Sequence, residues 1–170
     1  MTSERVSAGY LQQLNDAVAE LVTRPAIGSV VDSLKEQLQH TPEPFVWSTV
    51  DLESLSTPLP EQIKSGWIFV LKKDVGSGCH FHPNSIQHMV MIEGDGTSKV
   101  GSASGHMKLF DAQARALDET WYVIPEGVPH EFFPTGSDMV VVSFHTCEAD
   151  ELTEISCDSG AKREYEPRSK

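Results

Sequence analysis

From residue 45 onward the apolar residues come in short runs, which glycine, proline, aspartate and serine separate. Many short runs with frequent turn residues are typical of antiparallel β-sandwiches and barrels. No segment in this region has the length and periodicity of a crossover helix, which disfavours a parallel α/β fold. The sequence therefore predicts an all-β antiparallel domain with strands at 45–50, 67–72, 78–82, 87–93, 98–100, 106–111, 120–124, 130–133 and 139–145.

The N-terminal part of the chain has a helical periodicity instead. Apolar residues recur at the spacing of one helical face between Leu11 and Val22, and Ser7 is a candidate N-cap. Pro25 interrupts this pattern, and a second helix is expected over 27–38. We expect these helices either to cover an open end of the β domain or to build a dimer interface.

The length of 170 residues fits one domain. We expect an N-terminal helical extension at 1–43, a β-barrel at 44–158 and a flexible C-terminal tail at 159–170. One further edge strand is expected near 152–157, at the end of the barrel.

The net charge is −12, from 13 basic and 25 acidic residues. An acidic surface repels phosphate backbones and anionic lipids, so neither nucleic acid nor a membrane is expected as a partner. We see no signal-peptide core and no apolar run near the ~20 residues of a membrane helix. Three cysteines without a framework spacing argue against a disulfide scaffold, so Cys79 is expected to be a buried thiol in a reducing cytoplasm.

Two histidines separated by one residue, His80 and His82, are the most informative feature for chemistry. In a strand this spacing places both imidazoles on one face of the sheet. The turn sequence Pro-Asn-Ser at 83–85 reverses the chain, so the next strand brings Gln87 or His88 beside the pair. Three or four nitrogen and oxygen donors that converge in this way suit a divalent metal ion.

A second segment, Ile-Pro-Glu-Gly-Val-Pro-His at 124–130, presents one more histidine. Gly127 permits a tight turn, and the two prolines stiffen its flanks. His130 then begins a strand, so a rigid turn aims a single imidazole from a distant part of the chain.

Together these segments resemble the two sequence motifs of the cupin superfamily, as found in its single-domain members with one conserved barrel. The residues in register with the first motif are His80, His82, Gln87 and Gly94, and those in register with the second are Pro125, Gly127 and His130. The resemblance covers roughly 67–145. It implies an antiparallel double-stranded β-helix, or jelly-roll barrel, that holds one divalent metal ion.

Three positions depart from the motifs without touching the ligand set. Asp74 and Glu119 stand where the two motifs begin with glycine, and Pro134 stands where the second ends with asparagine.

A fourth departure changes the ligand set, because Gln87 replaces an acidic ligand. Its amide oxygen can still bind a metal, so the resemblance implies His80, His82, Gln87 and His130 as metal ligands. The replacement removes a carboxylate that could act as a base. Glu126, Glu131 and His145 are then the candidate bases.

Several neighbouring residues admit two roles. His88 alternates with Gln87 and should point to the opposite face, unless the preceding turn is one residue longer and makes His88 the ligand. Met89 and Met91 share the face of Gln87, as a substrate-binding wall or as plain core. His145 either faces the barrel interior, where it binds substrate, or is a satisfied core or surface histidine.

A metal held by neutral imidazoles and an amide keeps its full positive charge, which suits oxygen chemistry or Lewis-acid catalysis. The first hypothesis is a metal-dependent dioxygenase acting on a small organic substrate, with iron as the metal, since a three-histidine iron centre needs no carboxylate ligand. Nickel, manganese, zinc and cobalt suit the same donors. The alternatives are a non-oxidative isomerase or lyase on a sugar acid, and a sensor that binds a metal or small ligand without turnover.

The resemblance also bears on assembly. Cupins often pair through their sheets, and an exposed sheet edge invites such pairing, so a homodimer is expected.

Overall fold

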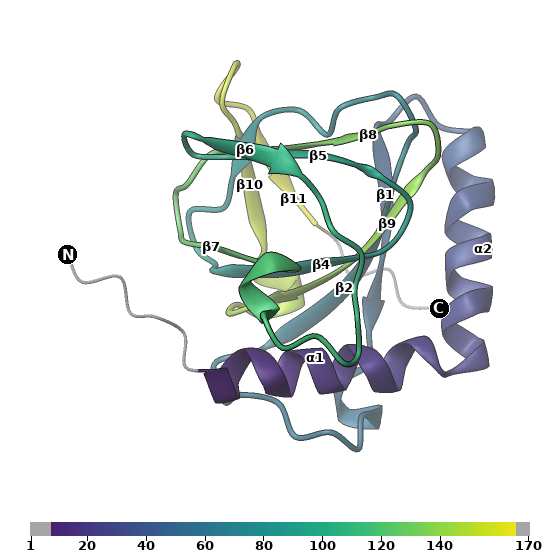
Figure 1. Ribbon diagram of the computed structural model, residues 1–170. Coiled ribbons are helices and arrows are strands. Elements are labelled where there is room, and N and C mark those ends of the chain that lie inside the picture. The colour runs from purple at the N-terminus through teal and green to yellow at the C-terminus, as the bar shows by residue number, and fades with distance from the viewer. Residues whose placement is uncertain (1–7, 166–170) are drawn as a thin grey trace.

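The computed structural model describes residues 8–165, which form two helices and two β-sheets (Figure 1). The helices are α1, Ala8–Val22, and α2, Pro25–Gln39. Pro25 occupies the first turn of α2, where a missing N–H costs nothing, so this helix begins two residues earlier than predicted. The predicted cap Ser7 lies outside the described residues. Three 3-10 turns occupy loops at Leu52–Ser54, Leu117–Glu119 and Ala149–Glu151.

The strands pair antiparallel throughout the two sheets. The first sheet has the order β1-β2-β9-β4-β7, and the second has the order β11-β10-β3-β8-β5-β6. The bounds in the first sheet are β1 Phe45–Val50, β2 Ser65–Leu71, β4 Gln87–Glu93, β7 Trp121–Ile124 and β9 Met139–His145. Those in the second are β3 His80–Phe81, β5 Gly96–Val100, β6 Ala103–His106, β8 His130–Pro134, β10 Thr153–Ser156 and β11 Lys162–Glu164.

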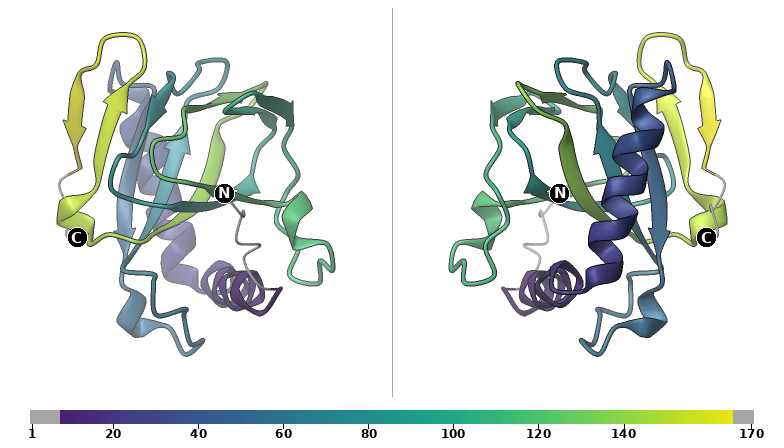
Figure 2. Two further views of the ribbon diagram at one scale, coloured as in Figure 1. Left: turned by 90° about the vertical axis from the view of Figure 1, so that its left-hand side faces the viewer. Right: turned by 90° about the vertical axis from the view of Figure 1, so that its right-hand side faces the viewer.

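Residues of the central strand β9 alternate between two apolar cores. Met139 and Val141 belong to the core inside the barrel, whereas Val140, Val142 and Phe144 belong to the core beneath the helices. A strand that is buried on both faces has an almost continuously apolar sequence, and β9 has such a sequence. Helix α2 packs on β1 and β2, and α1 crosses near one end of α2 (Figures 1 and 2). The helical extension therefore covers the outer face of the first sheet, not an open end of the barrel.

The predicted fold class, an all-β antiparallel barrel with a helical extension, is confirmed. The predicted bounds of β1, β4 and β9 agree with the structure. The strand predicted at 106–111 is wrong, because β6 occupies Ala103–His106. A tight turn in which Gly101 has a φ of 57° joins Val100 to Ala103, so the Gly/Ser-rich stretch forms a hairpin.

Asp74, which replaces the first glycine of the cupin motif, keeps the turn that a glycine would allow. Its φ is 58°, in the left-handed region that aspartate tolerates better than most residues. The Asp74 carboxylate accepts a hydrogen bond of 3.0 Å from the backbone N–H of Gly136. This bond ties the turn to the loop before β9.

The expected flexible tail at 159–170 is wrong for its first part. Strand β11 pairs with β10, and Tyr165 is buried in the barrel core. Residues 166–170 lie outside the described residues.

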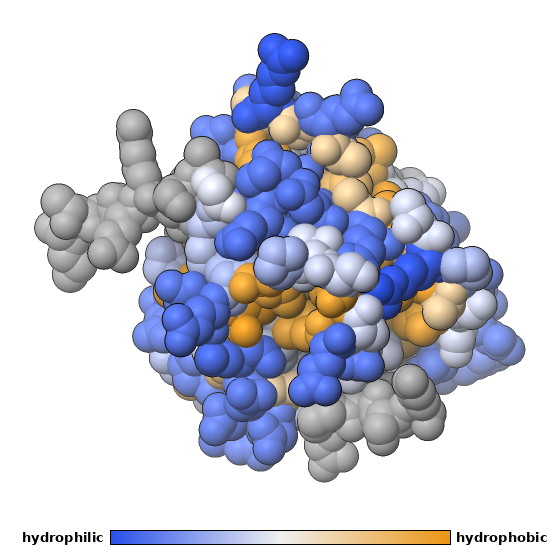
Figure 3. All heavy atoms as spheres, turned by 90° about the horizontal axis from the view of Figure 1, so that it is seen from below, coloured by the Kyte–Doolittle hydropathy of each residue, from blue (hydrophilic) through white to orange (hydrophobic). Residues whose placement is uncertain are grey.

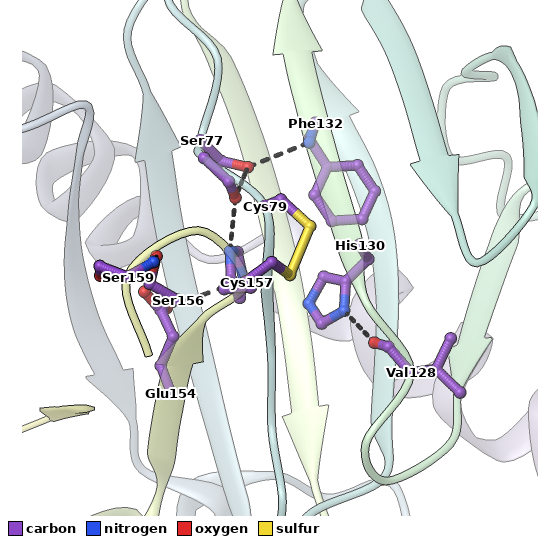
Figure 4. The surroundings of a disulfide bond; sticks show 11 residues. Ser77, Cys79, Val128, His130, Phe132, Glu154, Ser156, Cys157 and Ser159 are labelled. Atoms are coloured by element: carbon purple, nitrogen blue, oxygen red, sulfur yellow. Dashed lines mark hydrogen bonds and ion pairs between the residues drawn. A yellow bond between two sulfur atoms is a disulfide. The ribbon is translucent and has the colours of Figure 1, made fainter. Parts of the chain in front are cut away.

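Cys79 and Cys157 form a disulfide that joins the start of β3 to the end of β10, with the two Cα atoms 5.4 Å apart (Figure 4). The prediction that Cys79 is a free thiol is therefore wrong; Cys147 is buried and free. The two bonded cysteines are 78 residues apart and meet only through the pairing of β3 with β10. Because disulfides are rare in a reducing cytosol, the cysteines no longer support a cytoplasmic location, which stays a prediction.

The face seen from below, where α1 lies, is mostly hydrophilic with apolar side chains gathered near its middle (Figure 3). The large apolar residues most exposed in the described part of the chain are Val22, Val75, Leu109 and Phe133. Within residues 8–165, neither helix combines the length and the apolar character that crossing a membrane would require.

Candidate metal centre

His80, His82 and His130 gather at one place in the barrel. His80 in β3 lies directly opposite His130 in β8, with ring centroids 4.4 Å apart. The ring of His82 lies 5.4 Å from that of His80 and 5.3 Å from that of His130. One nitrogen from each ring lies within 4.8 Å of the other two, so the three residues can hold one ion between them.

A hydrogen bond from Nδ1 to a backbone carbonyl fixes each of the three imidazoles. The acceptors for His80, His82 and His130 are the carbonyl oxygens of Gly78, Thr153 and Val128, at 2.8, 2.8 and 2.9 Å (Figure 4 for His130). A carbonyl oxygen only accepts, so each Nδ1 carries a proton, and a ring in its neutral form presents the lone pair of Nε2. This is the tautomer and support that a metal-binding histidine needs.

Burial favours the neutral form of two of the three imidazoles. It is the largest cause that lowers the pKa of His82 to about 4 and the pKa of His130 to about 3. For His130 the neighbouring His80 lowers the pKa further. A neutral imidazole is the form that binds a metal ion.

Two buried side-chain atoms within residues 8–165 lack a hydrogen-bond partner, Nε2 of His130 and Oε1 of Gln87. Leaving such an atom unpaired costs about 1–3 kcal/mol, so these atoms indicate a partner that is not part of the chain. Both atoms offer an electron pair, and imidazole nitrogen and amide oxygen suit divalent cations. The residues present therefore fit a metal ion.

A hydrogen-bonded chain behind Gln87 explains which end of its amide is left unpaired. Nε2 of Gln87 donates to Oγ of Ser143 at 3.1 Å. Nε2 of His145 lies 3.2 Å from the same hydroxyl, and its Nδ1 lies 2.8 Å from Oγ of Ser85. His145 is thus fully buried and uses both ring nitrogens, as a satisfied core histidine does, and its contact with substrate stays a prediction.

A small pocket with a cavity volume of about 30 Å³ adjoins the histidines. His80, His82, Gln87 and Ser77 form its polar side. The other lining residues are apolar or aromatic, namely Phe45, Phe69, Leu71, Met89, Phe132, Val141 and Tyr165. Apolar and aromatic residues with a few polar groups are the lining that small-molecule sites have.

Alternation along β4 decides which of the other predicted residues face the pocket. His88 faces α1, where its Nε2 lies 3.2 Å from the hydroxyl of Tyr10, and its Nδ1 lies 3.3 Å from the Phe144 carbonyl oxygen. His88 is therefore wrong as an alternative ligand, because it points away from Gln87. Met89 lines the pocket, whereas Met91 is buried in the barrel core.

The candidate bases Glu126 and Glu131 do not line the pocket. The carboxylate beside the cluster belongs instead to Glu154 of β10, whose Oε2 lies 3.7 Å from Nε2 of His80. Tyr165 lines the pocket and donates its hydroxyl to Glu154. The sequence analysis predicted neither residue for the site, because the polar segment around them gives no sign of an inner face.

No protein-family model and no curated protein matches this chain, but solved structures do. The coconut allergen cocosin matches with a TM-score of 0.50 and 16% identity, over 68% of this chain and 29% of cocosin. Procruciferin, an 11S globulin from Brassica napus, matches with a TM-score of 0.50 and 12% identity, over 68% of this chain and 28% of its own. An oxalate oxidase in complex with the substrate analogue glycolate gives a TM-score of 0.46 and 15% identity, over 62% of this chain and 52% of the oxidase.

This chain therefore spans between 28% and 52% of these three solved chains. At such low identity the likeness concerns the fold. The shared barrel agrees with the histidine segments on the facing strands β3 and β8, which carry the two motifs. The chain therefore has the jelly-roll barrel fold that cocosin and procruciferin share.

Proposed function

We propose that this chain binds one divalent metal ion through Nε2 of His80, His82 and His130, with Oε1 of Gln87 as the fourth ligand. The observation that carries the proposal is the pair of unpaired buried atoms on His130 and Gln87. They lie in a cluster whose other two imidazoles also have Nδ1 bonded to backbone and Nε2 available.

We further propose that the protein is a metal-dependent dioxygenase with iron as its metal. The bound metal supplies the site at which dioxygen is activated. The aromatic and aliphatic pocket wall binds a small organic substrate and excludes water from it. This lining favours an apolar substrate over a sugar acid, because each hydroxyl of a sugar acid needs a hydrogen-bond partner when buried.

Elemental analysis of protein purified without chelators is the first test, followed by dioxygen uptake of the iron-loaded protein with catechols, thiols and sugar acids. We expect about one iron per chain and uptake with an apolar member of the panel. Conversion without dioxygen uptake indicates an isomerase or lyase, and tight binding without turnover indicates a sensor. A chain that retains none of iron, nickel, manganese, zinc or cobalt contradicts the proposal.

We also propose a homodimer. Each sheet ends in edge strands, β1 and β7 in the first and β11 and β6 in the second, and such edges are sites of strand pairing. Sedimentation velocity at micromolar concentration tests this, and a single monomeric species contradicts it.

A further inference from the structure

Strand β10 brings a carboxylate to the sheet face that carries the histidines. In the pairing of β3 with β10, Ser156 lies opposite His80. Cross-strand partners share a face, and so do residues two apart in one strand. Glu154 therefore lies on the face of His80, and its side chain is buried, with the whole residue 7% exposed.

Three neighbours surround this carboxylate. Its Oε2 lies 3.7 Å from Nε2 of His80 and accepts a hydrogen bond from the hydroxyl of Tyr165. Nε of Arg163 lies 3.9 Å from the other oxygen, Oε1. Burial, and then the charge of Glu154, raise the pKa of Tyr165 well above its usual value, so the phenol keeps the proton that it donates.

The charge of Glu154 is balanced on one side only. A buried carboxylate is costly unless a cation and hydrogen bonds compensate it. Arg163 stands at Oε1, and its side chain is 35% exposed, so water weakens its effect. On the side of Oε2 lies Nε2 of His80, at 3.7 Å, while Nδ1 of that ring donates to the Gly78 carbonyl oxygen. A cation bound between Glu154 and the histidines would complete the balance.

We propose that Glu154 is the acidic ligand of the metal centre, supplying through Oε2 the carboxylate that the first cupin motif lacks at Gln87. The inference rests on the proposed metal site. Atoms that share one ion with bonds of about 2 Å lie about 3 to 4 Å apart, and the 3.7 Å between Oε2 of Glu154 and Nε2 of His80 falls in that range. Glu154 lies outside the group of three histidines whose nitrogens are all within 4.8 Å of one another, so its carboxylate would reach the ion from the side of His80. A carboxylate oxygen can accept from Tyr165 and bind a metal at once, as ligating carboxylates usually do.

This assignment places the acidic ligand outside both motifs. The hairpin of β10 and β11 supplies it, and the Cys79–Cys157 disulfide ties that hairpin to the strand of His80. The same strand β10 provides the Thr153 carbonyl that orients His82. One C-terminal element therefore contributes both a ligand and the support of another.

Cobalt(II) is the probe, since its visible spectrum reports the ligand set and its affinity can be measured by competition with a chromophoric chelator. We expect Glu154→Gln in the full chain to bind cobalt at least 100-fold more weakly, beyond the 10–100-fold typical of losing a supporting group, and to change the spectrum. Glu126→Gln, which removes one exposed carboxylate, is the charge-matched control and keeps both parental values. Gln87→Glu added to E154Q restores affinity to within about tenfold, because it returns an acid to the centre.

Parental affinity and spectrum in E154Q overturn this inference and leave the proposed metal site standing. A parent chain that binds no divalent metal overturns both. Thermal unfolding of each metal-free variant reports whether the fold survives. If E154Q does not fold, Glu154→Asp is tested instead. The shorter side chain keeps the negative charge but moves the carboxylate away from the histidines. Parental affinity in E154D also overturns the inference.

Discussion

His80 and His130 face each other across neighbouring strands as a single antiparallel pair, with ring centroids 4.4 Å apart. Strand β3, which carries His80, is only two residues long. Strand β3 pairs with β8 on one side and with β10 on the other, and these two pairings hold it in position. The geometry of the centre therefore depends on strands from distant parts of the sequence.

Replacing His130 by alanine is expected to abolish stoichiometric metal binding. The change removes one of three converging nitrogens, and Nε2 of His130 has no other partner. Elemental analysis of purified protein measures the effect. His88→Ala is the control, because His88 is equally buried in the same region but faces Tyr10, and it should keep its metal. Equal metal content in H130A and the parent chain contradicts the site.

Ser143→Ala is expected to weaken metal binding about 10–100-fold while leaving every ligand in place. The Ser143 hydroxyl holds Nε2 of Gln87 and contacts His145, so its loss frees the amide to turn. Competition with a chromophoric chelator gives the affinity. Ser48→Ala, in β1, removes a hydroxyl that bonds the neighbouring Thr49 carbonyl, away from the histidines, and should have no effect. An unchanged affinity in S143A means that the amide is not positioned in this way.

The part of the site that lies on β4 could be predicted because its signal is local. Alternation along a strand sets Gln87 and Met89 on one face and His88 on the other, and the structure has them so. The strand itself is strongly apolar and flanked by turn residues, which fixed its bounds. Two histidine segments on separate strands then sufficed to indicate where the cluster would form.

The contribution of the C-terminal hairpin could not be predicted, because it depends on non-local pairing. Glu154 and Cys157 reach β3 only through the short β3–β10 ladder, which pairs two residues on each strand. Nothing in the polar segment around them indicates that register. Tyr165 follows a three-residue strand. The residues around it in the sequence are polar and charged, a composition that predicts a free tail.

Loss of the disulfide is expected to destabilise the fold by about 4–5 kcal/mol, since Cys79 and Cys157 close a loop over a separation of 78 residues. Chemical denaturation with and without reductant measures the loss. The double variant Cys79→Ser/Cys157→Ser is the control, because reductant should not change its stability further. A parent chain whose unfolding midpoint is indifferent to reductant contradicts the prediction.

Asn15 joins α1 to the first sheet through buried hydrogen bonds. Its Oδ1 accepts from Nε1 of Trp121 at 2.9 Å, and its Nδ2 donates to the Asp111 carbonyl at 3.2 Å. Asn15→Leu keeps the branching at Cγ but leaves both partners unpaired, so we expect a loss of about 2–5 kcal/mol in urea denaturation. Gln12→Ala, one turn away and exposed, should change stability by less than about 0.5 kcal/mol. A loss as small as that in N15L would mean that water replaces the asparagine.

The carboxylate of Glu20 ties α1 to the loop after β1. It accepts hydrogen bonds from the N–H groups of Ser56 and Thr57, both at 2.8 Å, and from the Thr57 hydroxyl at 2.7 Å. These bonds lower the pKa of Glu20 from its usual 4.5 to about 2, with the Ser56 bond as the largest cause.

Because the folded-state pKa of Glu20 lies below the unfolded value, the stabilisation is fully present above about pH 4.5 and is lost as pH falls toward 2. We expect Glu20→Gln to be less stable than the parent at pH 7, with the difference shrinking over that window. Denaturation at several pH values measures it. Gln39→Ala, at the exposed end of α2, does not titrate and should show a difference independent of pH. A constant difference for E20Q down to pH 2 contradicts the assignment, since the protonated carboxyl would then be holding the loop as well as the carboxylate does.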